Sequence, residues 1–405
     1  MLQGQNVQLE KRVISMPIVN RVAEFQPEIQ AWRRDIHEHP ELLYDVHRTA
    51  ALVADRLREF GCDEVVTGIG RTGVVGVIKG GKPAGNGDVK VIGLRADMDA
   101  LPIEEATNLP YASKTKGLMH ACGHDGHTAM LLGAARYLAE TRNFAGDAVV
   151  IFQPAEEGGA GAVAMIKDGL MDRFGIEQVY GMHNGPGIPI GSFALRPGPI
   201  MAGGDAVLIR IEGRGGHAAQ PHQSIDSVLV GAQLITALQS IVSRSVDPLE
   251  SAVISMCEFH AGHARNVIPH TAELKGTVRT LNGDVRDLVE RRIREVVAGV
   301  AQITGARIDL TYDRGYPVTI NHVRQTDVAT RAAREIAGDA NVQEMPPLMA
   351  GEDFAFMLEQ RPGALIFCGN GDSAGLHHPA YNFNDEAIVF GTSYWIKLVE
   401  NTLAA

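Results

Sequence analysis

The order of apolar segments along the chain constrains its fold more than any other feature of the sequence. Apolar runs of strand length alternate with stretches of helical periodicity over the first 195 residues, and the alternation resumes after residue 322. Strands that alternate with helices predict a parallel or mixed α/β sheet. The expected strands are 64–67, 73–79, 89–95, 147–153, 177–182 and 364–369, and the expected helices are 19–34, 48–60, 125–139, 161–170, 323–337 and 385–402.

A different pattern separates these two parts of the chain. A Pro- and Gly-rich crossing at 195–204 leads into strands 206–212, 251–260, 271–279 and 307–312 and helices 224–243 and 285–303. Their βαββαβ order is that of a four-stranded sheet with two helices, and roughly 115 residues suffice for a separate domain. We therefore expect one discontinuous domain, formed by 18–198 and 315–405, and an inserted domain at 199–314.

Composition narrows the class of protein. The chain has 405 residues and a net charge of −11, which argues against a nucleic-acid partner because phosphates require a basic surface. Its four cysteines are widely spaced, so a disulfide framework is not expected. Residues 1–17 contain no apolar stretch long enough for a signal or membrane span, and we expect them to be poorly ordered. A soluble, cytoplasmic enzyme is the default interpretation.

Nine residues, 119–127, carry three histidines, a cysteine and an aspartate. A single histidine usually has only a structural role, but Cys122 and His124 flank a glycine that lets both donors turn toward one metal ion. The residues that follow have helical periodicity. This pair therefore lies in a loop just before a helix.

Other polar side chains follow expected strands, where ligands gather in α/β sheets. Together with that pair they make five candidate metal ligands: Cys122, His124, Glu157, His183 and His377. Five exceed one tetrahedral zinc, and their spread along the chain is unlike a structural site. A thiolate, a carboxylate and three imidazoles suit two divalent ions about 3.5–4 Å apart, which can generate hydroxide and polarise a carbonyl. The chemistry indicated is hydrolysis.

Glu156 and Glu157 are adjacent and follow the strand at 147–153. One carboxylate can bind metal while the other takes the proton of the attacking water as general base. A solvated acidic turn is the ordinary interpretation of such a pair. Its place after a buried strand favours the catalytic interpretation.

At these residues the chain resembles a known family. It is similar to the dinuclear metallo-amidohydrolases of the aminoacylase and hippurate hydrolase type, in the zinc-exopeptidase group, from about Arg33 to the last helix. The matching motifs are Arg95-Ala-Asp-Met-Asp, His120-Ala-Cys-Gly-His-Asp-Gly-His, Phe152-Gln-Pro-Ala-Glu-Glu-Gly, Met182-His-Asn, Gly213-Arg-Gly-Gly-His, Asn266-Val-Ile-Pro, Gly276-Thr-Val-Arg, Gly351-Glu-Asp-Phe and His377-His-Pro. The Cys-Gly-His form resembles the branch of hippurate and auxin-conjugate hydrolases. Asp97 stands where another branch has its first ligand motif, so it is structural or supports a ligand.

The resemblance implies a mixed-sheet α/β catalytic domain with an inserted ferredoxin-like α+β domain for dimerisation and for a lid. It implies the five ligands above, with His377 rather than His378, and Glu156 as general base. His217 resembles the histidine that reaches a partner's active site to stabilise the oxyanion. The alternative interpretation, in which His217 is a loop histidine hydrogen-bonded within its own glycine-rich turn, stays open. Asn266 and Arg279 resemble groups that hold the substrate carboxylate, as bidentate arginines do.

The function expected is cleavage of the amide of an N-acyl-amino acid by a cytoplasmic homodimer, or dimer of dimers, with two divalent ions per chain. Zinc, manganese, cobalt and nickel are all compatible with the ligands. A carboxypeptidase or dipeptidase is the second interpretation, since only the acyl pocket would differ. A third, of another class, is a non-catalytic binding protein on this scaffold. No membrane or nucleic-acid partner is expected.

Overall fold

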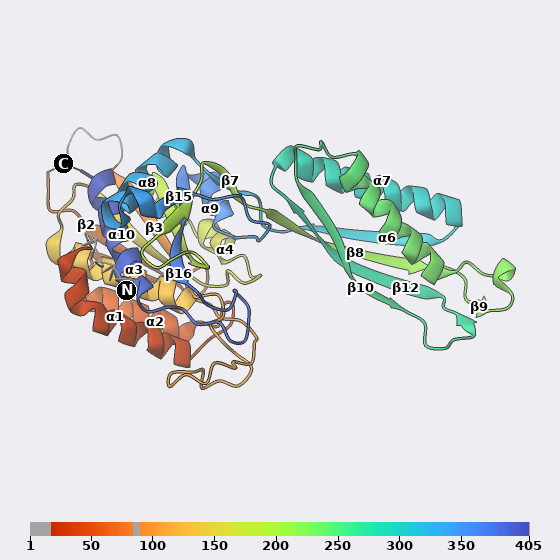
Figure 1. The fold of residues 1–405 in the computed structure, drawn as a ribbon, viewed down its shortest axis with the longest axis horizontal. Coiled ribbons are helices and arrows are strands. Elements are labelled where there is room, and N and C mark those ends of the chain that lie inside the picture. Colours follow the sequence, from red (N-terminus) through yellow and green to blue (C-terminus); the bar gives the residue numbers. More distant parts are fainter. Residues whose placement is uncertain (1–17, 84–89, 405) are drawn as a thin grey trace, which may run out of the picture.

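The computed structural model describes residues 18–83 and 90–404. The expected disorder of residues 1–17 lies outside this range. The described chain forms two lobes joined by a narrow connection (Figure 1). The larger lobe contains the first and last described residues, and the smaller contains the middle of the sequence.

The larger lobe is built on a mixed sheet of eight strands, which confirms the predicted mixed α/β class. Neighbouring strands at its centre are parallel, and the β1–β2, β2–β4 and β6–β16 pairs are antiparallel. In spatial order the strands are β1 (Glu64–Ile69), β2 (Gly73–Lys79), β4 (Asp147–Gln153), β3 (Val91–Asp97), β5 (Gln178–Pro186), β16 (Gly363–Gly371), β6 (Phe193–Leu195) and β15 (Val342–Glu344).

Helices cover both faces of this sheet. Alternate residues of β4 point to opposite sides, so Val150 packs in one core and Val149 in the other. One face is covered by α1 (Asn20–Glu38), α2 (His47–Glu59), α3 (His124–Thr141), α8 (Val323–Ala337) and α10 (Ala387–Thr402). The other is covered by α4 (Gly161–Lys167), α5 (Leu170–Arg173) and α9 (Ala355–Gln360). The predicted helices are present, except that the one expected at 161–170 is divided at Gly169, which has a φ of 86°, into α4 and α5. The elements α9, β6 and β15 are too short to show a periodicity.

The smaller lobe is a four-stranded antiparallel sheet in the order β10-β12-β8-β13, with two helices on one face and a core of its own. Its elements are β8 (Gly203–Glu212), α6 (Ser227–Arg244), β10 (Ala252–Ala261), β12 (Thr271–Thr280), α7 (Gly283–Thr304) and β13 (Arg307–Arg314). A short pair, β9 (Gly216–His217) and β11 (Val267–Ile268), forms its far tip (Figure 1).

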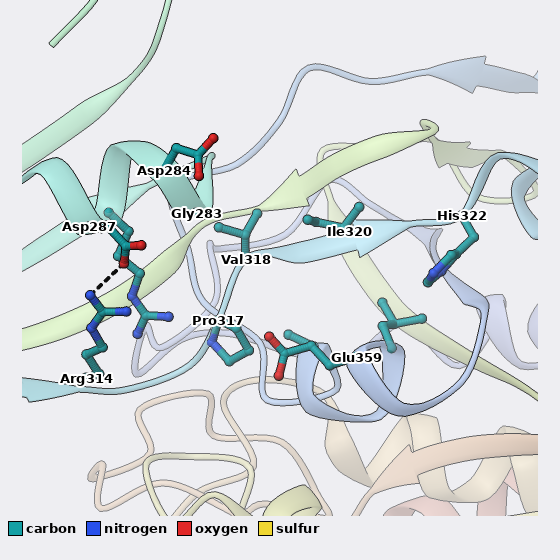
Figure 2. A pocket seen from close by; sticks show the side chains of 12 residues that line it. Gly283, Asp284, Asp287, Arg314, Pro317, Val318, Ile320, His322 and Glu359 are labelled. Atoms are coloured by element: carbon teal, nitrogen blue, oxygen red, sulfur yellow. Dashed lines mark hydrogen bonds and ion pairs between the residues drawn. The ribbon is translucent and has the colours of Figure 1, made fainter.

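Two chain segments connect the lobes. The Pro- and Gly-rich crossing contains a short strand, β7 (Gly198–Met201), which pairs with β14 (Thr319–Asn321) on the returning segment. Beside this pair a groove of about 550 Å³ runs between the start of α7 and the larger lobe. Figure 2 shows Asp284 and Asp287 on one side of the groove and Ile320, His322 and Glu359 on the other.

One helix within the described ranges, α6, is long and apolar enough to cross a membrane by length and composition alone. Core helices of soluble proteins pass the same test. The buried face of α6 packs on the four-stranded sheet of the smaller lobe.

Candidate metal centre

Cys122 lies in the loop before α3, and His124 is the first residue of that helix. The Gly123 backbone between them directs both side chains toward one site. Gly123 has a φ of 90°, a left-handed conformation that side chains disfavour. A Cβ at this position would lie 2.3 Å from Nδ2 of Asn184, which donates a hydrogen bond of 2.6 Å to the carbonyl of Cys122. Backbone conformation and close approach therefore both require glycine here.

Two buried histidines present the same nitrogen to the site. The Nδ1 atom of His124 lies 2.8 Å from the carbonyl oxygen of Asp99, and that of His183 lies 2.7 Å from the carbonyl oxygen of Asn184. A donated Nδ1–H leaves the Nε2 lone pair free to bind a metal. The Nε2 atom of His183 is 3.4 Å from Sγ of Cys122.

Glu157 and His377 complete a second group of donors around the same thiol. The residue His377 has a φ of 62°, and its N–H donates to the carbonyl of Ala121 at 2.8 Å, which fixes it beside the cysteine loop. Its Nε2 atom lies 3.3 Å from Oε1 of Glu157, and Nε2 of His124 lies 3.9 Å from that oxygen. All five candidate ligands thus meet in one place, although 255 residues separate the first from the last.

The five donors fall into two sets with one member in common. Cys122, His124 and His183 can place their donor atoms within 4.8 Å of one another, and so can Cys122, Glu157 and His377. Cys122 therefore belongs to both donor sets, which together could hold two divalent ions.

Unpaired atoms show that the site suits cations. Within the described residues, Nε2 of His124 and Oε1 of Glu157 are buried and have no hydrogen-bond partner. Buried polar atoms are normally paired, because leaving one unpaired costs about 1–3 kcal/mol. A divalent ion would pair both atoms, and imidazole, thiolate and carboxylate are the ligands that such ions take.

Glu156 lies in the wall of a cleft of about 380 Å³ next to these donors. Burial, followed by the charges of Glu352 and Glu157, raises the pKa of Glu156 well above its usual value. Burial alone would also raise the pKa of Glu157, but the nearby imidazoles of His377 and His124 lower it. Neighbouring carboxyl groups with pKa values moved in opposite directions suit one proton carrier and one charged ligand.

Sequence reasoning did not assign a role to Asp99, which holds the two glutamates in place. Its buried carboxylate accepts the backbone N–H groups of Glu156 and Glu157 at 3.0 and 3.1 Å. The only signal in the sequence was its position in the Arg95-Ala-Asp-Met-Asp motif. Burial raises the pKa of Asp99, and its contact with His124 opposes that shift.

The other two histidines of the cluster differ: His127 is hydrogen-bonded at both ring nitrogens, whereas both ring nitrogens of His120 are buried without a hydrogen-bond partner among the described residues. Nδ1 of His127 lies 2.7 Å from Oδ1 of Asp97, and its Nε2 accepts the backbone N–H of Asn184 at 2.9 Å. Both nitrogens of this ring are therefore occupied, and Asp97 supports the site from behind. His120 is buried, and burial lowers its pKa to about 3.

The three candidate substrate-binding residues lie in two different places in the structure. Arg279 lines the cleft that contains Glu156. His217 and Asn266 are exposed and lie together at the far tip of the smaller lobe, where Ala218 N–H donates to the carbonyl of Asn266. Within one chain, these two residues do not reach the cleft.

Comparisons with known proteins agree with this geometry. Residues 93–401 match the model of peptidase family M20/M25/M40. The chain is 47% identical to hippurate hydrolase of Campylobacter jejuni, over 95% of this chain and 98% of that one. It is 43% identical to N-acetyl-L-cysteine deacetylase of Bacillus subtilis, over 88% and 84%.

A solved structure has the same fold. A Bacillus subtilis protein described as a dinuclear metal-binding peptidase of the M20 family superposes with a TM-score of 0.80 at 35% identity, covering 94% of this chain and 99% of that one. A family match over most of the chain and high identity to full-length relatives confirm the resemblance read from the motifs. The chain belongs to peptidase family M20/M25/M40.

Proposed function

We propose that this protein is a metal-dependent hydrolase that cleaves the amide bond of N-acyl-amino acids. The observation that carries the proposal is the meeting of five metal-binding side chains with a buried carboxyl group of raised pKa in one cleft. Relatives named as hippurate hydrolase and N-acetyl-L-cysteine deacetylase act on such amides.

Two divalent ions would be held by the two donor sets, with Cys122 in both. Bound there, they would supply Lewis-acid polarisation of the amide carbonyl and lower the pKa of water. The donor types are compatible with zinc, manganese, cobalt and nickel. A thiolate ligand also suits a reducing compartment, which supports a cytoplasmic location.

The chain's own groups would complete the reaction. Glu156 would accept a proton from the attacking water and pass it to the leaving nitrogen; its raised pKa makes the carboxylate a stronger base for that transfer. The guanidinium of Arg279 would bind the carboxylate of the amino acid as a bidentate pair. Apolar side chains of the cleft, Met201, Leu348 and Phe367, would contact the acyl group.

A Glu156→Gln variant tests the mechanism. It should keep two metal ions per chain, measured by elemental analysis, and lose about 10²–10⁴-fold in kcat on benzoylglycine. Glu258→Gln, at an exposed glutamate of the smaller lobe, is the matched control. Undiminished hydrolysis by Glu156→Gln would show that the assigned base is wrong, and a wild type without hydrolysis would favour a binding protein on this scaffold.

A carboxypeptidase or dipeptidase is the second candidate function, because the family that the chain matches is a peptidase family. Only the group in the acyl pocket distinguishes it. A panel of N-acetyl, N-benzoyl and indole-acyl amino acids and dipeptides should rank the N-acyl compounds first in kcat/KM. A preference for dipeptides would select the second function instead.

The inserted domain at 199–314 would form the dimer and act as a lid. The exposed side of α6 supports this role: from Ser227 to Ser243 the helix has no charged residue, and Val228 and Leu229 are 42% and 56% exposed. Helix faces in water normally carry charge. The position of His217 and Asn266 far from their own cleft also supports a dimer, in which they would serve the partner's cleft.

The dimer is tested by light scattering after gel filtration. Wild type should have twice the mass of one chain or four times that mass, and Leu229→Glu should shift it toward the monomer. Thr236→Glu, also on the exposed side, should do the same, whereas Arg307→Glu on the last strand should not. A monomeric wild type with full activity would exclude the role proposed for His217.

A further inference from the structure

The two segments that connect the lobes are fastened to each other at the hinge. The backbone N–H of Gly204 donates to the carbonyl of Tyr316 at 2.9 Å, and the N–H of Gly315 donates to Oδ1 of Asp205 at 3.1 Å. Each segment therefore moves with the other when the smaller lobe moves.

Asp205 ties this hinge to the smaller lobe. Its carboxylate is 3% exposed and accepts Nε–H of Arg286 at 3.0 Å and the hydroxyl of Tyr312 at 2.6 Å. Arg286 lies in α7 and Tyr312 in β13, so a helix and a strand of that lobe both donate hydrogen bonds to the Asp205 carboxylate. Buried charge-assisted hydrogen bonds of this kind hold one geometry.

The side chain of Tyr316 reaches from the hinge into the larger lobe. Its hydroxyl donates to the carbonyl of Glu156 and accepts the N–H of Gly158 at 2.9 Å. Burial, followed by the charges of Asp353 and Glu156, raises the pKa of Tyr316, so the donor proton stays in place at neutral pH. The hydroxyl of this hinge residue is therefore hydrogen-bonded to the residues immediately before and after Glu157 in the chain.

The loop that receives this contact needs external support. Ala155, Gly158 and Ala160 all have positive φ angles, of 55°, 92° and 52°. Alanines in this region are strained and persist only where their surroundings hold them. A second tyrosine stabilises the same loop, because the hydroxyl of Tyr44 donates a hydrogen bond to the carbonyl of Gly159 at 2.6 Å. Tyr44 belongs to the larger lobe, whereas Tyr316 belongs to the hinge.

We propose that Tyr316 is a positioning residue that transmits the position of the smaller lobe to Glu156. When the lobe turns about the connection, the Asp205 anchor moves Tyr316, and its hydroxyl moves the loop on which the general base stands. Tyr44 holds the same loop without following the lobe. The proposal rests on the role of Glu156 proposed above and adds a path by which lobe closure would align it.

A double-mutant cycle tests the path, with kcat, KM and metal content measured on the full-length protein. Tyr316→Phe keeps the ring and removes the two hydrogen bonds, so kcat should fall about 10- to 30-fold with KM and metal content unchanged. Asp205→Asn should lower kcat in the wild type but add little in the Tyr316→Phe background. In the Tyr44→Phe background, Asp205→Asn should lower kcat by the same factor as in the wild type, because Asp205 and Tyr44 act independently.

Hydrogen exchange of a peptide covering 154–161 gives a readout that does not depend on activity. Asp205→Asn should speed exchange at Gly158 in the wild type and leave it unchanged in Tyr316→Phe. If Asp205→Asn does not fold, Arg286→Lys disturbs the same anchor more mildly. The path is excluded if Tyr316→Phe keeps kcat within about 2-fold of wild type, or if Asp205→Asn changes exchange equally in both backgrounds. Failure of the proposed function would appear separately, as an inactive wild type or an active Glu156→Gln.

Discussion

Replacement of Asp99 by Asn tests how far the catalytic loop depends on a side chain that contacts neither substrate nor metal. The carboxylate accepts the N–H groups of Glu156 and Glu157 through its two oxygens, at 3.0 and 3.1 Å. Asparagine keeps one oxygen and turns an NH₂ group toward the other N–H. The change therefore removes one charge-assisted hydrogen bond and weakens the second.

The expected loss follows from the number of bonds. A hydrogen bond to a charged group contributes about 1.5–3 kcal/mol, and a neutral one about 1 kcal/mol, so the loop should lose about 3 kcal/mol of support. If this loss appears in the transition state, kcat/KM falls about 10²-fold. Part of it should appear as weaker metal binding, because Glu157 is one of the ligands that the loop carries.

The assay compares kcat/KM on benzoylglycine at saturating metal with the metal content after dialysis. Asp226→Asn is the matched control: Asp226 also accepts two backbone N–H groups, at 2.9 and 3.2 Å, but caps α6 in the smaller lobe, where asparagine serves equally well. An Asp99→Asn enzyme within about 3-fold of wild type in both measurements would refute the reasoning, since the charge on the acceptor would then not matter.

Three further predictions follow from the same region. Peroxide should inactivate wild type faster than a metal-binding Cys122→Asp variant, and equal rates would exclude the thiolate as the sensitive ligand. Gly123→Ala should lose metal and stability, because its Cβ would meet Asn184 at 2.3 Å, whereas Gly187→Ala, with a φ of 84° and open space around it, should lose only about 1 kcal/mol of backbone strain. Burial would lower the pKa of His37, but the Asp125 carboxylate raises it above its usual value, so its contribution to stability is full below about pH 6.5 and is lost as pH rises through the folded-state pKa. Urea unfolding in EDTA should therefore show a difference between wild type and His37→Gln that is largest near pH 6 and shrinks as the pH rises above it; a constant difference would contradict the shift.

Local sequence patterns predicted most of the secondary structure, because burial of one side of a helix or strand leaves a period in the sequence. The βαββαβ order of the smaller lobe is one example, and the buried strand before Glu156 is another. Elements of three to six residues, such as β6, β15 and α9, contain too little of a period to be recognised. Their existence depends on neighbours far away in sequence, since β6 pairs with β15 and β16.

The types of metal ligand were also readable, because a thiol, imidazoles and a carboxylate after strand ends have few other uses together. Their grouping was not. Which ligands lie around the same thiol depends on where the loops after β4 and β16, and the His183 position within β5, meet the start of α3; only the packed sheet fixes those distances.

The sequence by itself determined the alternating elements, the inserted unit and the donor chemistry, since these follow from side-chain type and spacing. The tertiary structure alone decided that Cys122 joins both donor sets, that Asp99 and Tyr316 hold the loop of Glu156, and that His217 stands at the far tip of the smaller lobe. Each of these is a contact, or an absence of contact, between residues distant in sequence, and the folded backbone sets such distances rather than any local pattern.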